Sequence, residues 1–400
     1  MFSHCKLLTF AILAFTALAF TGCAPLVSGG PAKGGLPLTI SDDLDPESLD
    51  AAIRQSLAYL RRLPPDRVVG MQPRPLTAKE VGDSLLAFTN LLDSWRCMEC
   101  LAREINTHFD LLPSSAEPEL SEILFTGYYQ PVIQGSLAPS EKFRYPIYAK
   151  PADLITAERV TLTPKMTVDK IFGRAEGEQF LPHYSRREID EAGLLSGLGL
   201  EIAWVEDPVE LFFLHIQGSG VIQLPDGNKL LVGYAGQNGR PYRSIGRMLI
   251  DSGKISREEM SMQRLRQYLN DHPQERNEIL SHNESYIFFR VNPEGPLGSL
   301  DVPVTAGRSI ATDGRLFPKG ALALMQTEVP IIDGAGELTG WRPVARFVLN
   351  QDTGGAIRGP QRADYYFGTG DQAGELAGYM NRSGRLFFLV FKQGEVKNRD

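Results

Sequence analysis

The sequence NQDTGGAIRGPQRADYYFGTGD spans residues 350–371 and follows an apolar run at 344–349 that is typical of a strand. It contains three carboxyl groups, five glycines and three consecutive aromatic residues. Glycine permits tight turns and a close approach of the backbone to a ligand, while aromatic surface that excludes water raises the pKa of a carboxyl group. A protonated carboxyl group can donate a proton, so Asp352 and Asp364 are candidates for acid catalysis.

The composition indicates a folded, mainly β protein. The 400 residues are enough for about two domains and a tether. Apolar residues make up 42% and charged residues 22%, as in globular proteins, and the 39 glycines and 27 prolines indicate many turns and short strands. A formal net charge of −7, with no basic stripe interleaved with aromatics, speaks against nucleic acid as a partner.

Residues 1–22 resemble the signal peptide of a bacterial lipoprotein. Lys6 gives a weakly positive start, residues 7–20 are apolar or small, and Cys23 follows a short Thr-Gly pair. The resemblance implies cleavage before Cys23 and lipidation of this cysteine, which would hold the chain on a membrane surface. Ala24 matches the pattern for sorting to the outer membrane, so we expect the periplasmic face of that membrane. A plain secretory signal with a chance cysteine is the alternative.

Cys97 and Cys100 are the two cysteines that remain once Cys5 is removed with the signal and Cys23 is lipidated. A single C-x-x-C pair, with no second Cys or His pair at ligand spacing, predicts no metal site. The pair lies within a predicted helix, so a local disulfide and two reduced thiols are the alternatives. We expect no metal and no cofactor.

The N-terminal third is predicted to be a tether followed by helices. Residues 23–43 are rich in Gly, Pro, Ser and Leu without periodicity, which is typical of a flexible linker. Asp45-Pro46 starts one predicted helix, and the capping box at Thr77–Glu80 starts a second that continues past Cys100 towards Leu112. Further helices are predicted at 185–192, after Gly246, at 260–269 and at 277–282.

Short strands dominate from Leu124 onwards. The predicted strands are 124–131, 147–151, 201–205, 209–217, a hairpin at 221–232 with its turn at Asp226-Gly227, and a series between 285 and 391 that includes 302–304, 321–325, 329–332, 344–349 and 385–391. The last series favours a small closed barrel. His215 lies in the middle of a predicted strand and is interpreted as a packed core residue. The link at 218–220 lacks the features of a phosphate-binding loop.

Two segments have the composition of a saccharide groove. Sugars stack their apolar faces on aromatic rings and form hydrogen bonds to amides and hydroxyls. The segment 125–131 combines Tyr128 with Gln130, although both tyrosines there could instead be strand residues packing on two faces. The polar, glycine-rich segment 233–246 is long for a connection, and such loops tend to carry function.

Several motifs in this order resemble a known family. QDTGGAIRG (351–359), ADYYFG (363–368) and AGRSIATD (306–313) resemble the three-aspartate domain, named for its repeated aspartates. With FTGYYQP (125–131), HIQGSG (215–220) and YAGQNGRPYRSIG (234–246), the chain resembles the membrane-bound lytic murein transglycosylase A family over about residues 124–391.

The resemblance implies both an architecture and an activity. We expect a double-psi β-barrel domain with helices, built from residues 44–131 and 241–393, and a second β domain inserted at 132–240, with a saccharide groove between them. The family cleaves the β-1,4 bond between N-acetylmuramic acid and N-acetylglucosamine in peptidoglycan and leaves 1,6-anhydromuramic acid ends. Peptidoglycan is therefore the expected partner, and a monomer the expected state.

The family's catalytic aspartate matches Asp364, which would protonate the leaving oxygen and then accept the proton of the substrate's C6 hydroxyl. The aromatic residues at 365–367 and a charged Asp352 are expected to keep Asp364 protonated. Asp352 is either electrostatic support or an Asx-turn residue, while Asp313 is expected to be structural and Asp371 a loop residue. The candidate substrate-binding residues are Thr126, Tyr128, Gln130, Gln217, Gly218, Ser219, Tyr234, Gln237, Asn238, Gly354 and Gly355.

Two other functions fit the same residues. A hydrolase of the lysozyme type would use Asp352 as a second carboxylate beside Asp364. A non-catalytic lipoprotein that binds the cell wall would use the barrel as a binding module.

Overall fold

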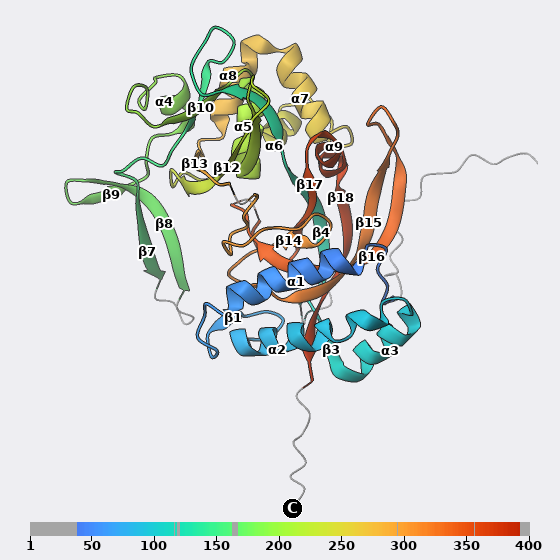
Figure 1. The fold of residues 1–400 in the computed structure, drawn as a ribbon. Coiled ribbons are helices and arrows are strands. Elements are labelled where there is room, and N and C mark those ends of the chain that lie inside the picture. Colours follow the sequence, from blue (N-terminus) through green and yellow to red (C-terminus); the bar gives the residue numbers. More distant parts are fainter. Residues whose placement is uncertain are drawn as a thin grey trace, which may run out of the picture. The chain divides into compact units, whose positions relative to one another are not determined.

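The computed structural model describes residues 38–392, apart from 116, 118–120, 162–166, 294 and 356. The predicted signal peptide, Cys23 and nearly all of the predicted tether lie outside the described residues. The described residues from 39 onwards form one compact unit, which is mainly β (Figure 1). Within the described part of the chain, no helix has the length and apolarity needed to cross a membrane.

Six strands close into a barrel. They are β4 (Glu122–Gln130), β14 (Ser309–Ala311), β15 (Leu322–Ile332), β16 (Leu338–Asp352), β17 (Arg362–Thr369) and β18 (Asn381–Phe391). The sheet order is β15-β16-β14-β17-β4-β18, and β15 also pairs with β18, which closes the ring. A further strand, β3 (Phe109–Pro113), pairs with β18 from outside the ring. The predicted small closed barrel is therefore confirmed, with its first strand taken from the N-terminal half.

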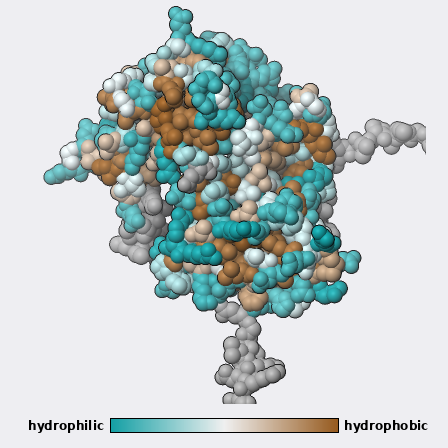
Figure 2. Space-filling view, viewed as in Figure 1, coloured by the Kyte–Doolittle hydropathy of each residue, from teal (hydrophilic) through white to brown (hydrophobic). Residues whose placement is uncertain are grey.

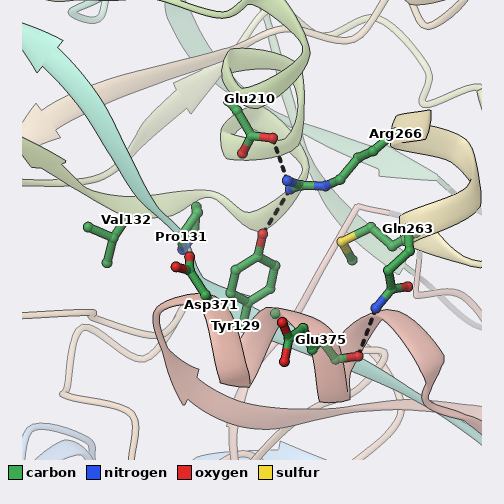
Figure 3. Close-up of a pocket in the computed structure, with 10 residues that line it drawn as sticks. Tyr129, Pro131, Val132, Glu210, Gln263, Arg266, Asp371 and Glu375 are labelled. Atoms are coloured by element: carbon green, nitrogen blue, oxygen red, sulfur yellow. Dashed lines mark hydrogen bonds and ion pairs between the residues drawn. The ribbon is translucent and has the colours of Figure 1, made fainter. Parts of the chain in front are cut away.

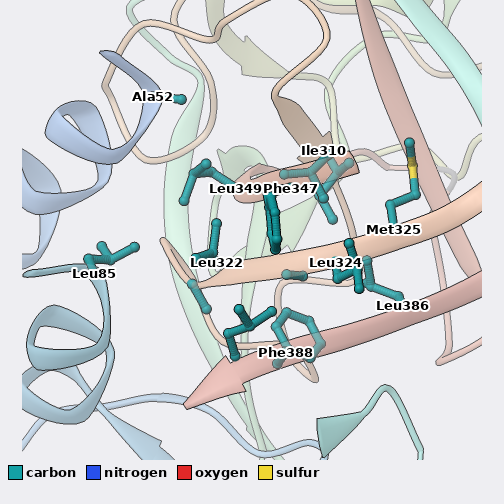
Figure 4. Close-up of a cluster of buried hydrophobic side chains, with 14 of the residues drawn as sticks. Ala52, Leu85, Ile310, Leu322, Leu324, Met325, Phe347, Leu349, Leu386 and Phe388 are labelled. Atoms are coloured by element: carbon teal, nitrogen blue, oxygen red, sulfur yellow. The ribbon is translucent and has the colours of Figure 1, made fainter. Parts of the chain in front are cut away.

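The barrel interior is the main hydrophobic core. Side chains of β15, β16 and β18, among them Leu324, Phe347 and Phe388, are fully buried and pack together (Figure 4). Helices α1 (Pro46–Leu60) and α2 (Ala78–Thr89) add the buried side chains of Leu49 and Leu85 to this cluster. The outward side of α1 is hydrophilic (Figure 2), as expected for a helix with one face on a core.

A second sheet has the strand order β13-β12-β11-β5-β10-β6. Its strands are β5 (Val132–Ser136), β6 (Tyr145–Tyr148), β10 (Glu201–Val205), β11 (Ser219–Gln223), β12 (Lys229–Gln237) and β13 (Ile287–Val291). β13 lies beyond the limits 132–240 that we expected for the inserted domain. Three further strands, β7 (Ile155–Thr161), β8 (Thr167–Glu176) and β9 (Gln179–Leu181), form an arm at the edge of the molecule (Figure 1), and β1 (Val68–Gly70) pairs with β2 (Leu76–Thr77).

The helices of this part pack against one another and on the second sheet. They are α4 (Arg186–Asp190), α5 (Pro208–Gln217), α6 (Ile245–Asp251), α7 (Met262–Asp271) and α8 (Pro273–His282), while α9 (Asp371–Tyr379) lies against β4 and β17. Buried Val209 and Phe212 of α5 meet Leu249 of α6 and Leu269 of α7 in one cluster. Helix α5 therefore links the helical layer to the sheet, whose side chains it also contacts through Leu211 and Leu214.

The prediction of a strand at 209–217 was wrong, because this segment is helix α5. Asp207 caps the helix through its side chain, Pro208 occupies the first turn, and Gly218 ends it with φ 77°. The helix is apolar almost all round, so it lacks the polar face that gives a helix its periodic pattern. His215 is consequently a buried helix residue, whose Nδ1 lies 2.9 Å from Nη1 of Arg186.

The long helix predicted from Thr77 to Leu112 is divided into several elements. The capping box at Thr77 and Glu80 is confirmed, but α2 ends at Thr89 and a 3-10 turn (Leu92–Ser94) follows. Helix α3 (Met98–His108) then begins with Cys97 as its cap, and Cys97 is joined to Cys100 by a disulfide. The remainder of the predicted helix is the strand β3. In the last part of the chain, 302–304 is not a strand, and 321–325 and 329–332 belong to the single strand β15.

Ion pairs attach the residues just before α1 to the barrel. Asp42, which we had assigned to the tether, forms an ion pair of 2.6 Å with Arg308, and both side chains are fully buried. The same guanidinium donates to the carbonyl oxygen of Asp45 and the hydroxyl of Ser48. Asp43 accepts hydrogen bonds from Nε and Nη2 of Arg346 on β16. The folded part of the chain therefore includes the end of the predicted tether.

We predict that Asp42→Asn lowers the free energy of unfolding by about 3–5 kcal/mol, because it leaves the buried charge of Arg308 without its carboxylate. Urea unfolding followed by circular dichroism measures this change. Asp251→Asn is the matched control, since it breaks the exposed pair with Arg247, and its effect should stay within about 1 kcal/mol. Equal unfolding midpoints for the two variants would contradict a structural role for the buried pair.

Candidate active site

Asp364 lies on strand β17, and its carboxyl group faces β4. The two strands are parallel, and Asp364 is the register partner of Thr126. The hydroxyl of Thr126 donates to Oδ1 of Asp364 across the strands. Residues 362–369 of the carboxylate-rich stretch 350–371 thus form a strand, and this strand positions the candidate catalytic group on rigid backbone.

The Thr126–Asp364 contact is the first of three side-chain pairs on one face of β4 and β17. The rings of Tyr128 and Tyr366 follow, with their centroids 5.0 Å apart. The next pair is Gln130 and Thr369, whose hydroxyl donates to Oε1 of Gln130 over 3.0 Å. We call these three pairs the polar ladder. Tyr128 and Gln130, which we had expected to line a saccharide groove, therefore lie in one row with Thr126 and Asp364.

The opposite face of the two strands belongs to the interior. Phe125, Ala363 and Tyr365 are buried in the barrel core. Gly127 allows α9 to approach β4, because a Cβ at this position would come within 2.5 Å of the backbone of Ala377. Strand alternation thus separates a core face from a face that carries the polar ladder.

Asp352 ends strand β16, and its place on the same face follows from the sheet register. Ala311 of β14 is the partner of Asp352 on one side and of Asp364 on the other. Register partners point to the same side of a sheet, so the two carboxyl groups share a face. Their backbones are two strand spacings apart, or roughly 10 Å. The structure therefore brings the two candidate aspartates to one row of the barrel.

The half-buried carboxyl group of Asp352 has an unusual environment. Burial raises the pKa of Asp352 to about 6, against the hydrogen bonds that Oδ1 accepts from the backbone N–H groups of Ser299 and Thr353, each 2.8 Å long. The hydroxyl of Tyr128 lies close to this carboxyl group without meeting the geometry of a hydrogen bond. Burial, with the negative charges of Asp352 and Asp364 nearby, raises the pKa of Tyr128 well above its ordinary value.

The flanking aromatic residues surround Asp364 less than we expected. Tyr365 is buried in the core and its hydroxyl donates to the carbonyl oxygen of Gly307, while Phe367 packs against Tyr365 on the same side. Tyr366 shares the face of Asp364. The expectation that all three aromatics cover the carboxyl group was therefore wrong, because successive strand residues point to opposite faces.

Arg362 is a neighbour of Asp364 that the sequence analysis did not single out. Its Nε lies 3.2 Å from Oδ1 of Asp364 and its Nη2 lies 3.3 Å from Oγ1 of Thr126. The spacing of two residues puts Arg362 and Asp364 on one face once the segment is known to be a strand. Arg362 therefore contacts both members of the Thr126–Asp364 pair.

Tyr242 is a second residue that the sequence analysis missed. It follows the polar segment after β12 and is 40% exposed. Burial raises the pKa of Tyr242, and the charges of Arg362 and Asp364 act more weakly on its hydroxyl group, so this ring lies in the neighbourhood of Asp364. The signal available was its position in the glycine-rich segment 233–246, which we had expected to carry function.

Of five further candidates, Gln217 contacts the barrel, and the other four lie at the end of α5 or in the second sheet. Oε1 of Gln217, at the end of α5, accepts a hydrogen bond of 3.1 Å from the backbone N–H of Tyr129. Gly218 is the left-handed residue that ends α5, and Ser219 begins β11 opposite Gly233. Tyr234 and Gln237 lie on β12, where Tyr234 is 43% exposed. These positions are compatible with ligand contact, but their described hydrogen bonds serve the fold.

Asn238 is buried and its side chain is fully used by the protein. Its amide nitrogen donates to the carbonyl oxygens of Tyr184 and Glu284, and its amide oxygen accepts from the backbone N–H groups of Arg240 and Tyr286. The expectation that Asn238 contacts substrate is corrected, because it holds three chain segments together. Gly354 and Gly355 lie in the loop between Asp352 and β17, as predicted from the sequence.

The two remaining aspartates have different surroundings. Asp313 is fully buried and accepts hydrogen bonds from the side chain of Arg315 and from the backbone N–H of Gly359, so it ties two loops together. Asp371 is the first residue of α9 and not a loop residue. Among the described residues, no group of three or more His, Cys, Asp or Glu side chains could hold a metal ion.

A cavity of about 170 Å³ lies on the other face of β4, between α5, α7 and α9 (Figure 3). Arg266 donates to Glu210 and, over 2.9 Å, to the hydroxyl of Tyr129. Asp371 and Glu375 line the same cavity. Because Tyr129 points away from Thr126 and Tyr128, this cavity is separate from the polar ladder.

We predict that Asp352→Asn stabilises the fold at neutral pH. The pKa of this carboxyl group rises from 3.8 to about 6 on folding, so between these pH values the folded chain binds more protons than the unfolded chain. The free energy of unfolding of the parent therefore falls as the pH rises through this window. Asparagine keeps the acceptor for Ser299 and Thr353 without the charge. Its advantage over the parent in the free energy of unfolding should grow from near zero at about pH 4 to about 1–3 kcal/mol at about pH 7. A difference that does not change with pH in urea titrations would contradict this environment.

Two family models match the chain, the MltA specific insert domain over residues 124–290 and the 3D domain over residues 308–390. Membrane-bound lytic murein transglycosylase A of Escherichia coli (strain K12) is 38% identical over 275 residues, which are 68% of this chain and 67% of that protein. A protein of the same name from Vibrio cholerae serotype O1 is 32% identical over 271 residues, which are 67% of this chain and 65% of that protein.

Solved structures give the same result. The crystal structure of membrane-bound lytic murein transglycosylase from Agrobacterium tumefaciens aligns with a TM-score of 0.70 and 33% identity, covering 87% of this chain and 93% of that chain. The crystal structure of E. coli MltA with bound chitohexaose aligns with a TM-score of 0.64 and 28% identity, covering 90% of this chain and 96% of that chain. The chain belongs to the membrane-bound lytic murein transglycosylase A family and is an enzyme of that class.

Proposed function

We propose that this enzyme cleaves the β-1,4 bond between N-acetylmuramic acid and N-acetylglucosamine in peptidoglycan and leaves 1,6-anhydromuramic acid ends, with Asp364 as acid and then base. The observation that carries the proposal is the position of Asp364. Its carboxyl group lies on the face of a closed barrel, beside Thr126 and at the start of a row with the neighbouring rings of Tyr128 and Tyr366, which are tilted by 38° to each other. Cleavage of a glycosidic bond needs a proton donor, and an aromatic surface can bind the apolar face of a sugar ring.

The reaction needs one carboxyl group and the substrate's own hydroxyl. Protonated Asp364 donates its proton to the bridging oxygen as the bond to the anomeric carbon breaks. The resulting carboxylate takes the proton from the C6 hydroxyl, whose oxygen bonds to the anomeric carbon and closes the anhydro ring. Among the described residues, the contacts of Asp364 go to Oδ1, which leaves Oδ2 as the oxygen for both transfers.

Asp352 is proposed to act through its charge and not as a nucleophile. A retaining hydrolase needs its two carboxyl groups about 5 Å apart. The register of β14 separates the backbones of Asp352 and Asp364 by roughly twice that distance. A negative charge at Asp352 would favour the positive charge that develops at the anomeric carbon.

We propose that the saccharide lies along the polar ladder and extends towards the second sheet. Thr126, Tyr128 and Gln130 belong to the ladder, and Nε2 of Gln130 is buried with no hydrogen-bond partner among the described residues, which supports a role as donor to a ligand. The further contacts proposed are Gln217, Gly218, Ser219, Tyr234, Gln237, Gly354 and Gly355. The E. coli relative solved with chitohexaose supports an N-acetylated sugar chain as ligand.

We also propose that Cys23 is lipidated and that residues 23–38 connect the lipid to the barrel at the periplasmic face of the outer membrane. The double-psi arrangement is proposed for the barrel, which the two parallel pairings β14–β16 and β4–β17 support. The enzyme is proposed to act as a monomer. The limits expected from the sequence, 44–131 and 241–393 for the barrel and 132–240 for the inserted domain, are changed in the proposal so that α6, α7, α8 and β13 go with the inserted domain, because β13 belongs to the second sheet and the helices cluster with α5.

Asp364→Asn should lower the rate of muropeptide release from purified murein sacculi by at least about 100-fold, because asparagine cannot transfer the proton. Asp371→Asn is the matched control, since Asp371 lies on the other side of β4, and it should retain the parent rate. If the parent and Asp364→Asn both bind sacculi and neither releases soluble muropeptides, the chain is a binding protein and not an enzyme on this substrate.

Digestion in oxygen-18 water tests the fate of the anomeric carbon. An anhydro ring takes its oxygen from the substrate, so mass analysis should find no label in the new muramic acid ends. Label in reducing ends would show hydrolysis and would contradict the proposed transglycosylase reaction.

A further inference from the structure

Cys97 and Cys100 form a disulfide at the start of helix α3, apart from the polar ladder. Cys97 is exposed and Cys100 is half-buried, so solvent reaches one sulfur more readily than the other. Sγ of Cys97 also accepts a hydrogen bond of 3.2 Å from the backbone N–H of Cys100 and thereby caps the helix. The proposed cleavage reaction uses neither sulfur.

A purely structural role explains this disulfide poorly. The stabilisation that a disulfide gives by closing a loop grows with the length of the loop, and this loop spans three positions. Helix α3 is attached to the barrel by other contacts, because the side chains of Leu101 and Ile105 are buried in the main core. The disulfide therefore adds little to the fold, while exposed disulfides are the ones that exchange with thiols.

Trp95 connects the disulfide to the interior of the barrel. It precedes Cys97 by two positions, in the turn that leads into α3. Its ring centroid lies 6.0 Å from that of Phe347 and 5.8 Å from the guanidinium carbon of Arg308. Arg308 forms the buried ion pair with Asp42 that attaches the segment before α1. A movement of the turn at Cys97 therefore changes the contact between Trp95 and this pair.

We propose that Cys97 and Cys100 form a redox site, which a dithiol reduces in the folded protein, and that reduction loosens the contact of Trp95 with Arg308. The ligand of this site is a thiol compound, bound covalently through Cys97. The inference does not depend on the cleavage reaction. It assigns a separate function to a part of the chain that lies beside the attachment of the N-terminal segment.

The reaction is thiol–disulfide exchange in two steps. A thiolate of the dithiol attacks the exposed Sγ of Cys97, and Cys100 leaves as a thiolate that takes a proton from water. The second thiol of the reagent loses its proton to water and attacks the reagent sulfur of this mixed disulfide, so that Cys97 leaves and is protonated in turn. Two electrons and two protons pass to the protein, and the dithiol is oxidised to a disulfide.

Reduction changes the way in which α3 begins. It removes the covalent link between Cys97 at the cap and Cys100 in the first turn. A thiol is a weak hydrogen-bond acceptor, so reduced Cys97 is a poor helix cap. We expect the first turn and the preceding turn with Trp95 to move, while Leu101 and Ile105 keep the rest of the helix on the core.

Reduction under native conditions tests the access to this site. The full-length protein in detergent is treated with dithiothreitol, and the free thiols are alkylated and assigned by peptide mass mapping, separately from Cys5 and Cys23. The rate should lie within about tenfold of the rate for the chain unfolded in urea. A disulfide that opens only through global unfolding would react about 10³-fold more slowly or worse. A native rate more than about tenfold below the unfolded rate would overturn the proposal.

Reduced thioredoxin, used in a parallel reaction, identifies the size of the reagent that the site accepts. Reduction by thioredoxin as well as by dithiothreitol supports a protein dithiol as the natural reagent. Reduction by dithiothreitol alone supports a small dithiol.

Two matched variants test which sulfur is attacked. Cys100→Ser leaves a single thiol at Cys97, and Cys97→Ser leaves one at Cys100. With glutathione disulfide, the thiol of Cys97 should form a mixed disulfide at least about tenfold faster than that of Cys100, because reactivity follows exposure. Equal rates, or a faster reaction at Cys100, would contradict the attack on Cys97.

The fluorescence of Trp95 tests the link to the interior. The chain has three tryptophans, so Trp204→Phe with Trp341→Phe leaves Trp95 alone. Reduction should raise the rate of acrylamide quenching of this residue at least about twofold, because the ring becomes more accessible when the turn opens. The same chain with both Cys97→Ser and Cys100→Ser is the control and should not respond to dithiothreitol.

Unchanged quenching after complete reduction would overturn the link to Trp95. If the tryptophan variants do not fold, as judged by their urea midpoints, hydrogen exchange of the parent decides instead. The peptide that covers residues 92–101 should then exchange its amides faster in the reduced protein than in the oxidised protein, and equal exchange would overturn the link in the same way.

Discussion

The site depends on the parallel pairing of β17 with β4. These strands come from opposite ends of the described chain, and the hydrogen bond between Thr126 and Asp364 joins residues 238 positions apart. The pairing closes the ring of six strands and at the same time sets the register of the polar ladder. A shift of one residue would turn Asp364 into the core and Tyr365 out of it, so the barrel core and the reactive face are fixed together.

The two aspartates on this face of the barrel, Asp352 and Asp364, have different surroundings. Asp364 has a hydroxyl and a guanidinium beside it, whereas Asp352 accepts hydrogen bonds from the backbone N–H groups of Ser299 and Thr353. Burial dominates at Asp352 and raises its pKa to about 6, whereas the side chain of Arg362 beside Asp364 is 36% exposed. The two carboxyl groups therefore share one face of the barrel but have different partners.

Local signals in the sequence were enough for many elements. Caps at Asp45 and Thr77 and the turn at Asp226-Gly227 are short-range patterns, and each occurs in the structure where the residues indicate it. The motif at 125–131 indicated a saccharide groove by its composition, but its nearness to Asp364 depends on the pairing of β4 with β17. What could be predicted is thus set by interactions between residues a few positions apart, together with a resemblance that carries long-range information.

Errors occurred where the deciding partner is distant in the sequence. Helix α5 has no polar face because it is enclosed by the second sheet and by α6–α8, so its composition is that of a buried strand. Asp42 and Asp43 have the composition of a linker, and they become structural because Arg308, Arg342 and Arg346 meet them across more than half of the chain. Neither the enclosure nor the charge compensation has a local pattern. Arg362 was missed for the same reason, because the side of the sheet on which it lies is known only once β17 is paired with β4.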